Sequence, residues 1–161
     1  VNIHQHIIDG RNINIPNGWT LDDLFVSGGL SDFYNPKRPD IMAIQPIQYI
    51  DGNVIDATPT VTFKWAYSDK SFRVYKQYKE ALLTRYKKDR LISTKKVDIF
   101  RLNSDEHFIR IINKNKVSTY TAVEWLYIGN SSAMSANTLI TNSDEIKKLQ
   151  PVVESVFLQL M

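Results

Sequence analysis

The sequence predicts an α+β fold in which an antiparallel β-sheet is flanked by a long central helix and a C-terminal helix. Residues 60–67, TVTFKWAY, alternate apolar and polar side chains, as a half-buried strand does. Residues 68–92 change to apolar spacings of three and four, which is typical of an amphipathic helix. Segments 95–102, 107–114 and 117–128 are joined by short polar links, and links this short require antiparallel hairpins.

The first 40 residues are rich in turn-forming residues and are expected to be irregular, within a single domain that spans residues 1–161. In this part, Ile13 and Ile15 alternate as one face of a short strand. The Pro-Asn-Gly sequence at 16–18 then predicts a turn before Trp19.

Residues 41–50, IMAIQPIQYI, are apolar enough for a strand, but Pro46 lacks an amide hydrogen and is expected at an edge or a bulge. The Asp-Gly-Asn sequence at 51–53 predicts a turn. The long helix has an aromatic stripe at helical spacing, which is expected to be its buried face. The stripe consists of Phe72, Tyr75, Tyr78, Leu82 and Tyr86.

The last strand is expected at 133–141, AMSANTLIT, and a terminal helix follows it. Asn142 and Glu145 have the spacing of a capping box. Pro151 would break a continuous helix, so the sequence predicts a short turn and then a helix from about residue 150. This helix is expected to pack on the sheet.

Composition argues against several functions. The 20 Lys and Arg residues against 17 Asp and Glu give a net charge of +3 without a basic stripe, so nucleic-acid binding is not expected. The chain has no cysteine, which excludes disulfides, thiolate nucleophiles and cysteine-ligated metals. No apolar run is long enough to span a bilayer. No serine lies in a nucleophile elbow and no phosphate loop is evident, so neither an enzyme nor a cofactor is predicted.

The sequence HQHIIDG at 4–10 raises a metal-dependent alternative. His4 and His6 stand at positions i and i+2, where a strand would point both to one face, and Asp9 would be a third ligand for zinc or iron. His107 is the one further histidine in the sequence. We favour the simpler interpretation of polar residues on an exposed terminal strand. A metal-dependent hydrolase that uses the His4 and His6 pair is kept as an alternative.

The exposed face of the sheet offers better candidates for binding. If the apolar side of 60–67 packs under the helices, the opposite face presents Thr62 and Lys64, with Tyr120 and Glu124 or their neighbours on the long strand. A face that mixes small, aromatic and charged groups suits docking of a protein or peptide, and it suits plain solvent equally. These four residues are the candidate partner-binding residues.

Three segments carry a resemblance to a known superfamily. They are IPNGW at 15–19, YKQYKEALLTRYKKDRLI at 75–92 and LQPVVESVFLQL at 149–160. With the order of the strands, they make the whole chain resemble the Mog1/PsbP-like superfamily, including its DcrB-like and type VI secretion effector-chaperone branches. The resemblance implies an α/β/α sandwich and an accessory, chaperone or envelope protein. The family has no shared functional residue, so none is transferred, and the irregular segment from Leu21 to Asp40 departs from the pattern.

These observations predict a non-catalytic, protein-binding accessory protein of a bacterial envelope or secretion system, such as an immunity protein or a lipoprotein. The first residue is Val1 rather than Met, so a trimmed segment is expected upstream, as a signal peptide or a lipid anchor would explain. The predicted location is therefore the periplasm or cell envelope. The first alternative is a cytoplasmic chaperone that shelters an apolar segment of a secreted effector on its sheet face.

Overall fold

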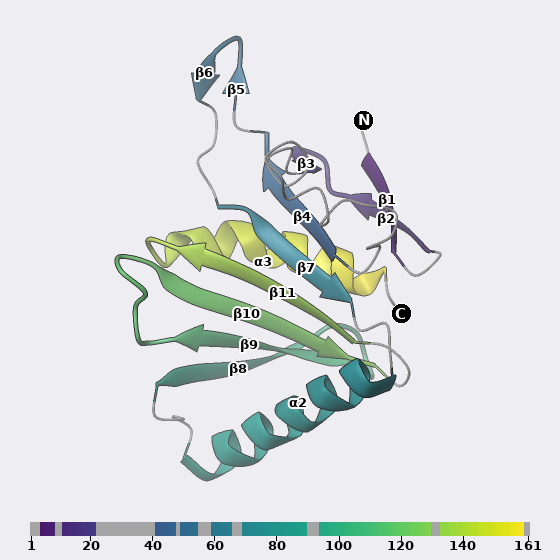
Figure 1. Ribbon diagram of the computed structural model, residues 1–161, viewed down its shortest axis with the longest axis vertical. Coiled ribbons are helices and arrows are strands. Elements are labelled where there is room, and N and C mark those ends of the chain that lie inside the picture. Colours follow the sequence, from purple (N-terminus) through teal and green to yellow (C-terminus); the bar gives the residue numbers. More distant parts are fainter. Residues whose placement is uncertain are drawn as a thin grey trace.

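The computed structural model confirms the α+β fold with an antiparallel sheet and helices on both of its faces (Figure 1). The structure describes residues 4–8, 11–21, 41–47, 49–54, 59–65, 69–89, 94–129 and 133–159. The strands of the main sheet are β3 (Trp19–Leu21), β4 (Ile41–Pro46), β7 (Val61–Trp65), β8 (Lys95–Arg101), β9 (His107–Asn113), β10 (Thr121–Ile128) and β11 (Ala133–Ile140). The helices are α2 (Asp69–Asp89) and α3 (Asp144–Leu158).

The seven strands of the main sheet lie in the order β3-β4-β7-β11-β10-β9-β8, and every neighbouring pair is antiparallel. The predicted meander is confirmed, because β8, β9, β10 and β11 follow one another both in sequence and in space. β11 then lies against β7, and β7 lies against β4. Hence β11 separates β10 from β7, although β7 precedes it by a long stretch of chain.

Two short hairpins complete the described strands. β1 (His4–Ile8) pairs with β2 (Arg11–Ile15), and β5 (Tyr49–Ile50) pairs with β6 (Asn53–Val54). The turn between β5 and β6 places Asp51 and Gly52 at φ values of 51° and 80°. Two successive positive φ values are those of a tight hairpin turn, which confirms the turn predicted at 51–53. Pro46, for which an edge or a bulge is predicted, is instead the last residue of the inner strand β4, opposite Trp19 of β3 and beyond the part of β4 that pairs with β7.

The alternation of β7 sets the main core. Val61, Phe63 and Trp65 are buried, whereas Lys64 between them is exposed. Because pairing in an antiparallel sheet keeps opposed residues on one face, Phe63 shares its face with Ala136 of β11 and, through it, with Trp125 of β10. This is the face that α3 covers.

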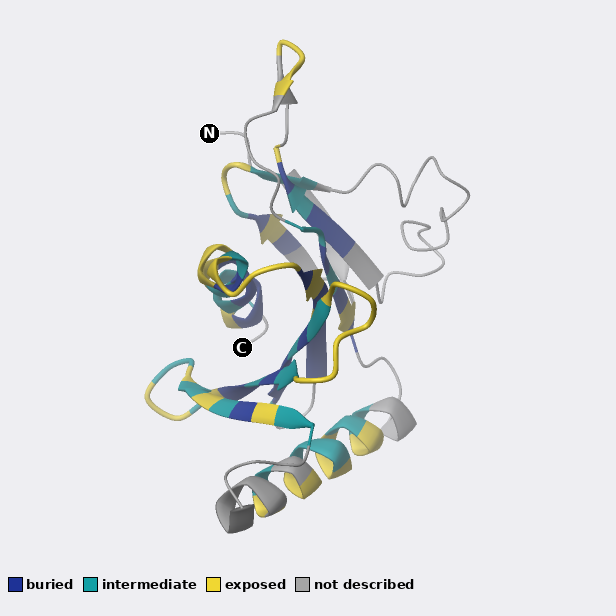
Figure 2. Ribbon diagram, turned by 90° about the vertical axis from the view of Figure 1, so that its left-hand side faces the viewer, coloured by how far each residue is buried: buried dark blue, intermediate teal, exposed yellow. Residues whose placement is uncertain are grey.

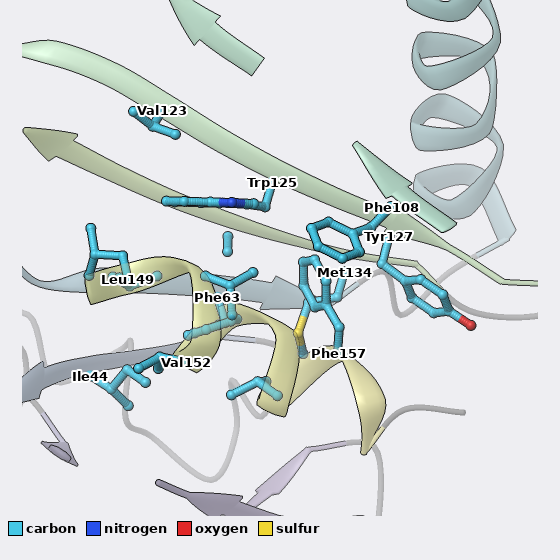
Figure 3. Packing of buried hydrophobic residues seen from close by; sticks show 14 of the residues in the cluster. Ile44, Phe63, Phe108, Val123, Trp125, Tyr127, Met134, Leu149, Val152 and Phe157 are labelled. Carbon is cyan, nitrogen blue, oxygen red and sulfur yellow. The ribbon is translucent and has the colours of Figure 1, made fainter. Parts of the chain in front are cut away.

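α3 is held by an aromatic cluster around Phe157 (Figure 3). The Phe157 ring centroid lies 5.7 Å from that of Phe108, 5.9 Å from that of Tyr127 and 6.4 Å from that of Phe63. Two of these contacts are edge-to-face, an arrangement that adds to the gain from burial. The cluster joins the last turns of the chain to three strands.

Hydrogen bonds hold the middle and the C-terminal end of α3. The Trp125 indole Nε1 donates to Gln150 Oε1 at 2.6 Å, and Arg110 Nη1 donates to the same oxygen at 3.3 Å. At the C-terminal end, the Gln159 side chain accepts from the backbone N–H of Asn14 at 2.7 Å and donates to its carbonyl at 2.9 Å. The second pair attaches the N-terminal hairpin to the helix, and it satisfies one donor and one acceptor of β2.

α2 covers part of the opposite face of the sheet (Figure 2). Phe72, Tyr75 and Tyr78 are half-buried and pack against a cluster that includes Ile109 and Leu126. The predicted apolar stripe therefore does face the sheet, but its described members remain partly accessible. The side chains of the two remaining members of the stripe, Leu82 and Tyr86, lie outside the described part of the chain.

The start of the terminal helix differs from the sequence expectation. α3 is continuous over Pro151, whereas a helix from about residue 150 was expected. Pro151 is exposed, and its neighbours Val152 and Val153 are buried, so packing of this face compensates for the hydrogen bond that proline removes. The expected capping box is also absent from this end, because Glu145 bonds to the backbone N–H and hydroxyl of Thr141 instead.

Among the described helices, none is both long and apolar enough to cross a membrane. The 22–40 segment, which departs from the superfamily pattern, lies outside the described residues.

Replacing Phe157 with alanine is expected to lower the free energy of unfolding by about 3–5 kcal/mol, because it removes a fully buried ring that contacts three strands. Urea denaturation followed by circular dichroism measures this. Leu158→Ala is the matched control: Leu158 is the next residue of α3 and is 45% exposed, so a change of less than about 0.5 kcal/mol is expected. Equal losses in the two variants would contradict this account of the core.

Candidate groove on the α2 side of the sheet

An open-sided groove of about 650 Å³ lies on the face of the sheet that α2 covers in part. Its floor crosses β7, β11, β10 and β9 and reaches β8, and its wall includes Tyr78 of α2. Such volumes are typical of sites that hold drug-sized ligands or short peptide segments. Apolar contacts come from Pro59, Ile111, Ala122 and Leu139.

The order of residues along β10 explains why the groove forms at one end of this face. On this side of the sheet β10 presents Ala122, Glu124, Leu126 and Ile128 in turn. Leu126 and Ile128 are buried in the cluster beneath α2, whereas Ala122 and Glu124 line the groove. Leu126 and Ile128 therefore provide an apolar surface on which α2 packs. Ala122 and Glu124 provide no such surface, so the groove lies over that half of the strand.

A row of cross-strand neighbours forms the floor. Thr62 of β7 lies opposite Asn137 of β11, Asn137 lies opposite Glu124 of β10, and Glu124 lies opposite Ile111 of β9. All four residues line the groove. Because residues opposed in an antiparallel sheet point to the same face, the row places a hydroxyl, an amide and a carboxyl side by side.

Glu124 is joined to two other polar groups. The Tyr78 hydroxyl hydrogen-bonds with the Glu124 carboxylate. Lys95 Nζ donates to Tyr78 Oη at 3.2 Å and lies 5.5 Å from the centre of the Tyr78 ring. Lys95 comes from the first position of β8, and Tyr78 comes from the middle of α2. The three side chains therefore tie the helix to two strands of the sheet.

Burial raises the pKa of the Glu124 carboxyl above its ordinary value of 4.5. The Lys95 ammonium and the Tyr78 hydrogen bond act in the opposite direction, since both favour the ionised carboxylate, but they do not overcome the loss of hydration. The Glu124 charge is therefore only partly compensated by the protein. An incompletely compensated carboxylate that lines a groove is a candidate contact for a ligand.

The structure brings together two of the four candidate residues. Thr62 and Glu124 line the groove, with one residue of β11 between them. Lys64 is exposed on the same face of β7, two residues beyond Thr62, and it does not line the groove. Tyr120 precedes β10 in a turn that it closes with Val117; it is 43% exposed and does not line the groove.

Sequence reasoning missed two members of the polar cluster. The sequence predicts Tyr78 as part of an apolar stripe, and its hydroxyl gives no signal of a polar role. Lys95 begins a strand that carries a second lysine, so nothing in the sequence singled it out. Both depend on where α2 crosses the sheet, which is a tertiary feature.

The histidine pair lies in a separate part of the structure. β1 pairs with β2, so that the backbone of His4 lies opposite Ile15 and that of His6 lies opposite Ile13. Asp9 is outside the described residues, and His107 begins β9 in the main sheet. In the described part of the chain, no group of three or more His, Cys, Asp or Glu residues is placed to hold a metal ion.

No family model matches the chain, and no curated protein matches it. One similar solved structure is cyanobacterial PsbP (CyanoP) from Synechocystis sp. PCC 6803, with a TM-score of 0.40 and 9% sequence identity over 98% of this chain and 90% of that chain. At this TM-score and identity, the match transfers no function.

Glu124→Gln is expected to make the protein more stable than the wild type at neutral pH and no more stable below about pH 4. Because the folded state keeps the Glu124 proton to a higher pH than the unfolded chain, wild-type stability falls as pH rises above 4.5 and through the raised pKa. Glutamine resembles the protonated carboxyl, so the variant does not undergo this loss of stability as pH rises. Urea denaturation at several pH values measures the difference between the two proteins.

Glu80→Gln is the control for this experiment, because Glu80 is an exposed glutamate on α2. Its stability curve is expected to run parallel to that of the wild type. A Glu124→Gln difference that stayed constant from pH 4 to pH 8 would show that burial does not raise the pKa of Glu124.

Proposed function

We propose that this chain is a non-catalytic accessory protein that binds a segment of another protein in the groove on the α2 side of its sheet. The observation that carries the proposal is the groove itself. It is open-sided, it crosses several strands, and it combines apolar walls with a few convergent polar groups. These are the properties of a binding site for a ligand that must be oriented, with specificity provided by a few polar contacts.

The polar cluster of Glu124, Tyr78 and Lys95 favours ligand binding over catalysis. The Tyr78 hydroxyl is engaged by Lys95 on one side and by Glu124 on the other. A hydroxyl held in this way orients its neighbours, and it is less available for proton transfer to a substrate. We therefore propose a partner-binding role for Thr62 and Glu124, and a place for Lys64 and Tyr120 at the margin of the same surface.

The proposed setting is the bacterial envelope or a secretion system, where the chain would act as an immunity protein or a lipoprotein. Its support is the order of elements that the sequence shares with the Mog1/PsbP-like superfamily. A second candidate is a cytoplasmic chaperone for a secreted effector. Leu139 favours it, because this groove-lining residue is 48% exposed and offers an apolar contact to an unfolded segment.

Site-specific photo-cross-linking tests the proposal. A benzophenone amino acid at Leu139, inside the groove, is expected to give discrete protein adducts in cells of the native host. The same amino acid at Val74 is the control, because Val74 is 57% exposed on α2 and does not line the groove. Mass spectrometry of the adducts would identify the partner, and cell fractionation would distinguish an envelope partner from a cytoplasmic effector.

A variant that fills the groove makes this experiment specific. Ala122→Trp adds a large ring to the floor and is expected to remove the Leu139 adducts while leaving the protein folded, as judged by circular dichroism. Adducts that persisted in this variant, or that formed equally from Val74, would contradict binding in the groove.

A further inference from the structure

Glu124 is the only acid and Lys95 the only base among the described residues that line the groove. Lys95 is held on the β8 side of the groove by its hydrogen bond to Tyr78. On the β11 side, the neighbour of Glu124 is Asn137, and on β9 it is Ile111, and neither carries a charge. The carboxylate therefore meets a cation on one side alone, and its other side faces uncharged groups of the groove.

The shape of the groove suits an extended chain. Its lining runs from Lys95 on β8 to Thr62 on β7. This path crosses four interstrand steps of about 4.8 Å, roughly 19 Å in all. A polypeptide in extended conformation covers that distance with about six residues at roughly 3.3 Å each.

The walls beside Glu124 suit a side chain with an apolar stem. Ala122 precedes Glu124 by two positions on the same face of β10, and Leu139 lies opposite Ala122 on β11. With Ile111 on the other side, these residues form an apolar approach to a single carboxylate. Lysine and arginine have the matching construction, since their methylene stems lie along apolar surface and their cationic heads reach a polar group.

We infer that the groove recognises a basic residue of the partner: a lysine or arginine in an extended segment lays its stem on Ala122, Leu139 and Ile111 and pairs its cation with the Glu124 carboxylate. This inference rests on the proposed function and deepens it, because it names the chemistry of the segment that binds. An acidic segment, which Lys95 would attract, is the opposite outcome and is distinguished by the test below.

The pairing makes binding depend on pH. The groups that face Glu124 are the Tyr78 hydroxyl from α2, the Lys95 ammonium from β8, and the uncharged Asn137 and Ile111 from the neighbouring strands. Because burial raises the pKa of Glu124, the carboxyl keeps its proton to a higher pH than an exposed glutamate does, and a ligand cation must displace that proton. Affinity for a basic segment is therefore expected to increase with pH until Glu124 is fully ionised.

A matched peptide panel tests the inference. The probes are capped heptapeptides of the sequence Ser-Ala-Val-X-Val-Ala-Ser, in which X is arginine, its uncharged isostere citrulline, or glutamate. Titration into ¹⁵N-labelled protein, followed by two-dimensional NMR, gives both the affinity and the residues whose amides shift. The arginine peptide is expected to bind about tenfold more tightly than the citrulline peptide and to shift the amides of Thr62, Ala122 and Asn137.

Two variants test whether Glu124 is the residue that pairs with the arginine of the peptide. Glu124→Gln is expected to reduce the arginine preference to less than about twofold and to remove its pH dependence, while the citrulline peptide binds as before. Lys95→Gln is expected to preserve or increase the preference. Thermal unfolding checks that both variants fold.

Each outcome has a distinct meaning. Equal binding of arginine and citrulline peptides, or tighter binding of the glutamate peptide, would overturn the inference and leave the groove as a peptide site. If no peptide shifted groove amides while the protein was folded, the proposed function would fail together with the inference. An arginine preference that survived Glu124→Gln would place the cation elsewhere.

Discussion

The packing of α3 against the sheet is the interaction on which the rest of the structure depends. Phe157 contacts aromatic rings from β7, β9 and β10, which are distant in the sequence and lie in one continuous sheet. Burial of this face decides which side of every strand points inward, because a slip of one residue in any strand would turn its apolar set outward. The hydrogen bonds at Gln150 and Gln159 then fix where the helix lies along the sheet.

The opposite face of the sheet, which α2 covers in part, carries fewer buried apolar side chains. β9 and β10 carry large aliphatic residues toward one end of that face and polar or small residues toward the other. α2 buries the first end, and Tyr78 is the point at which the helix meets the polar end. A binding groove thus arises from an uneven distribution of side-chain volume along two strands, without a dedicated loop.

Glu124 shows what this arrangement costs. The Glu124 carboxylate lies beside α2 on an inner strand and loses hydration, and the ammonium of Lys95 and the hydroxyl of Tyr78 compensate for this loss only in part. Residues that lower stability are frequent at sites of function, where a ligand supplies the missing interaction.

By itself, the sequence determined the class and order of the elements. Period-two alternation marked β7, short polar links required the hairpins from β8 to β10, and the three-and-four spacing marked α2. Strand alternation also led to the choice of Thr62 and Glu124 together, and the two lie on one face of the sheet, which α2 covers in part. The tertiary structure alone decided that β11 would lie between their strands, that Tyr120 would fall in a turn, and that Pro151 would remain inside α3. It also brought Tyr78 and Lys95 to Glu124. The physical reason is that local patterns report which side of an element is buried, whereas the neighbour of a strand and the crossing point of a helix depend on contacts between segments far apart in the chain.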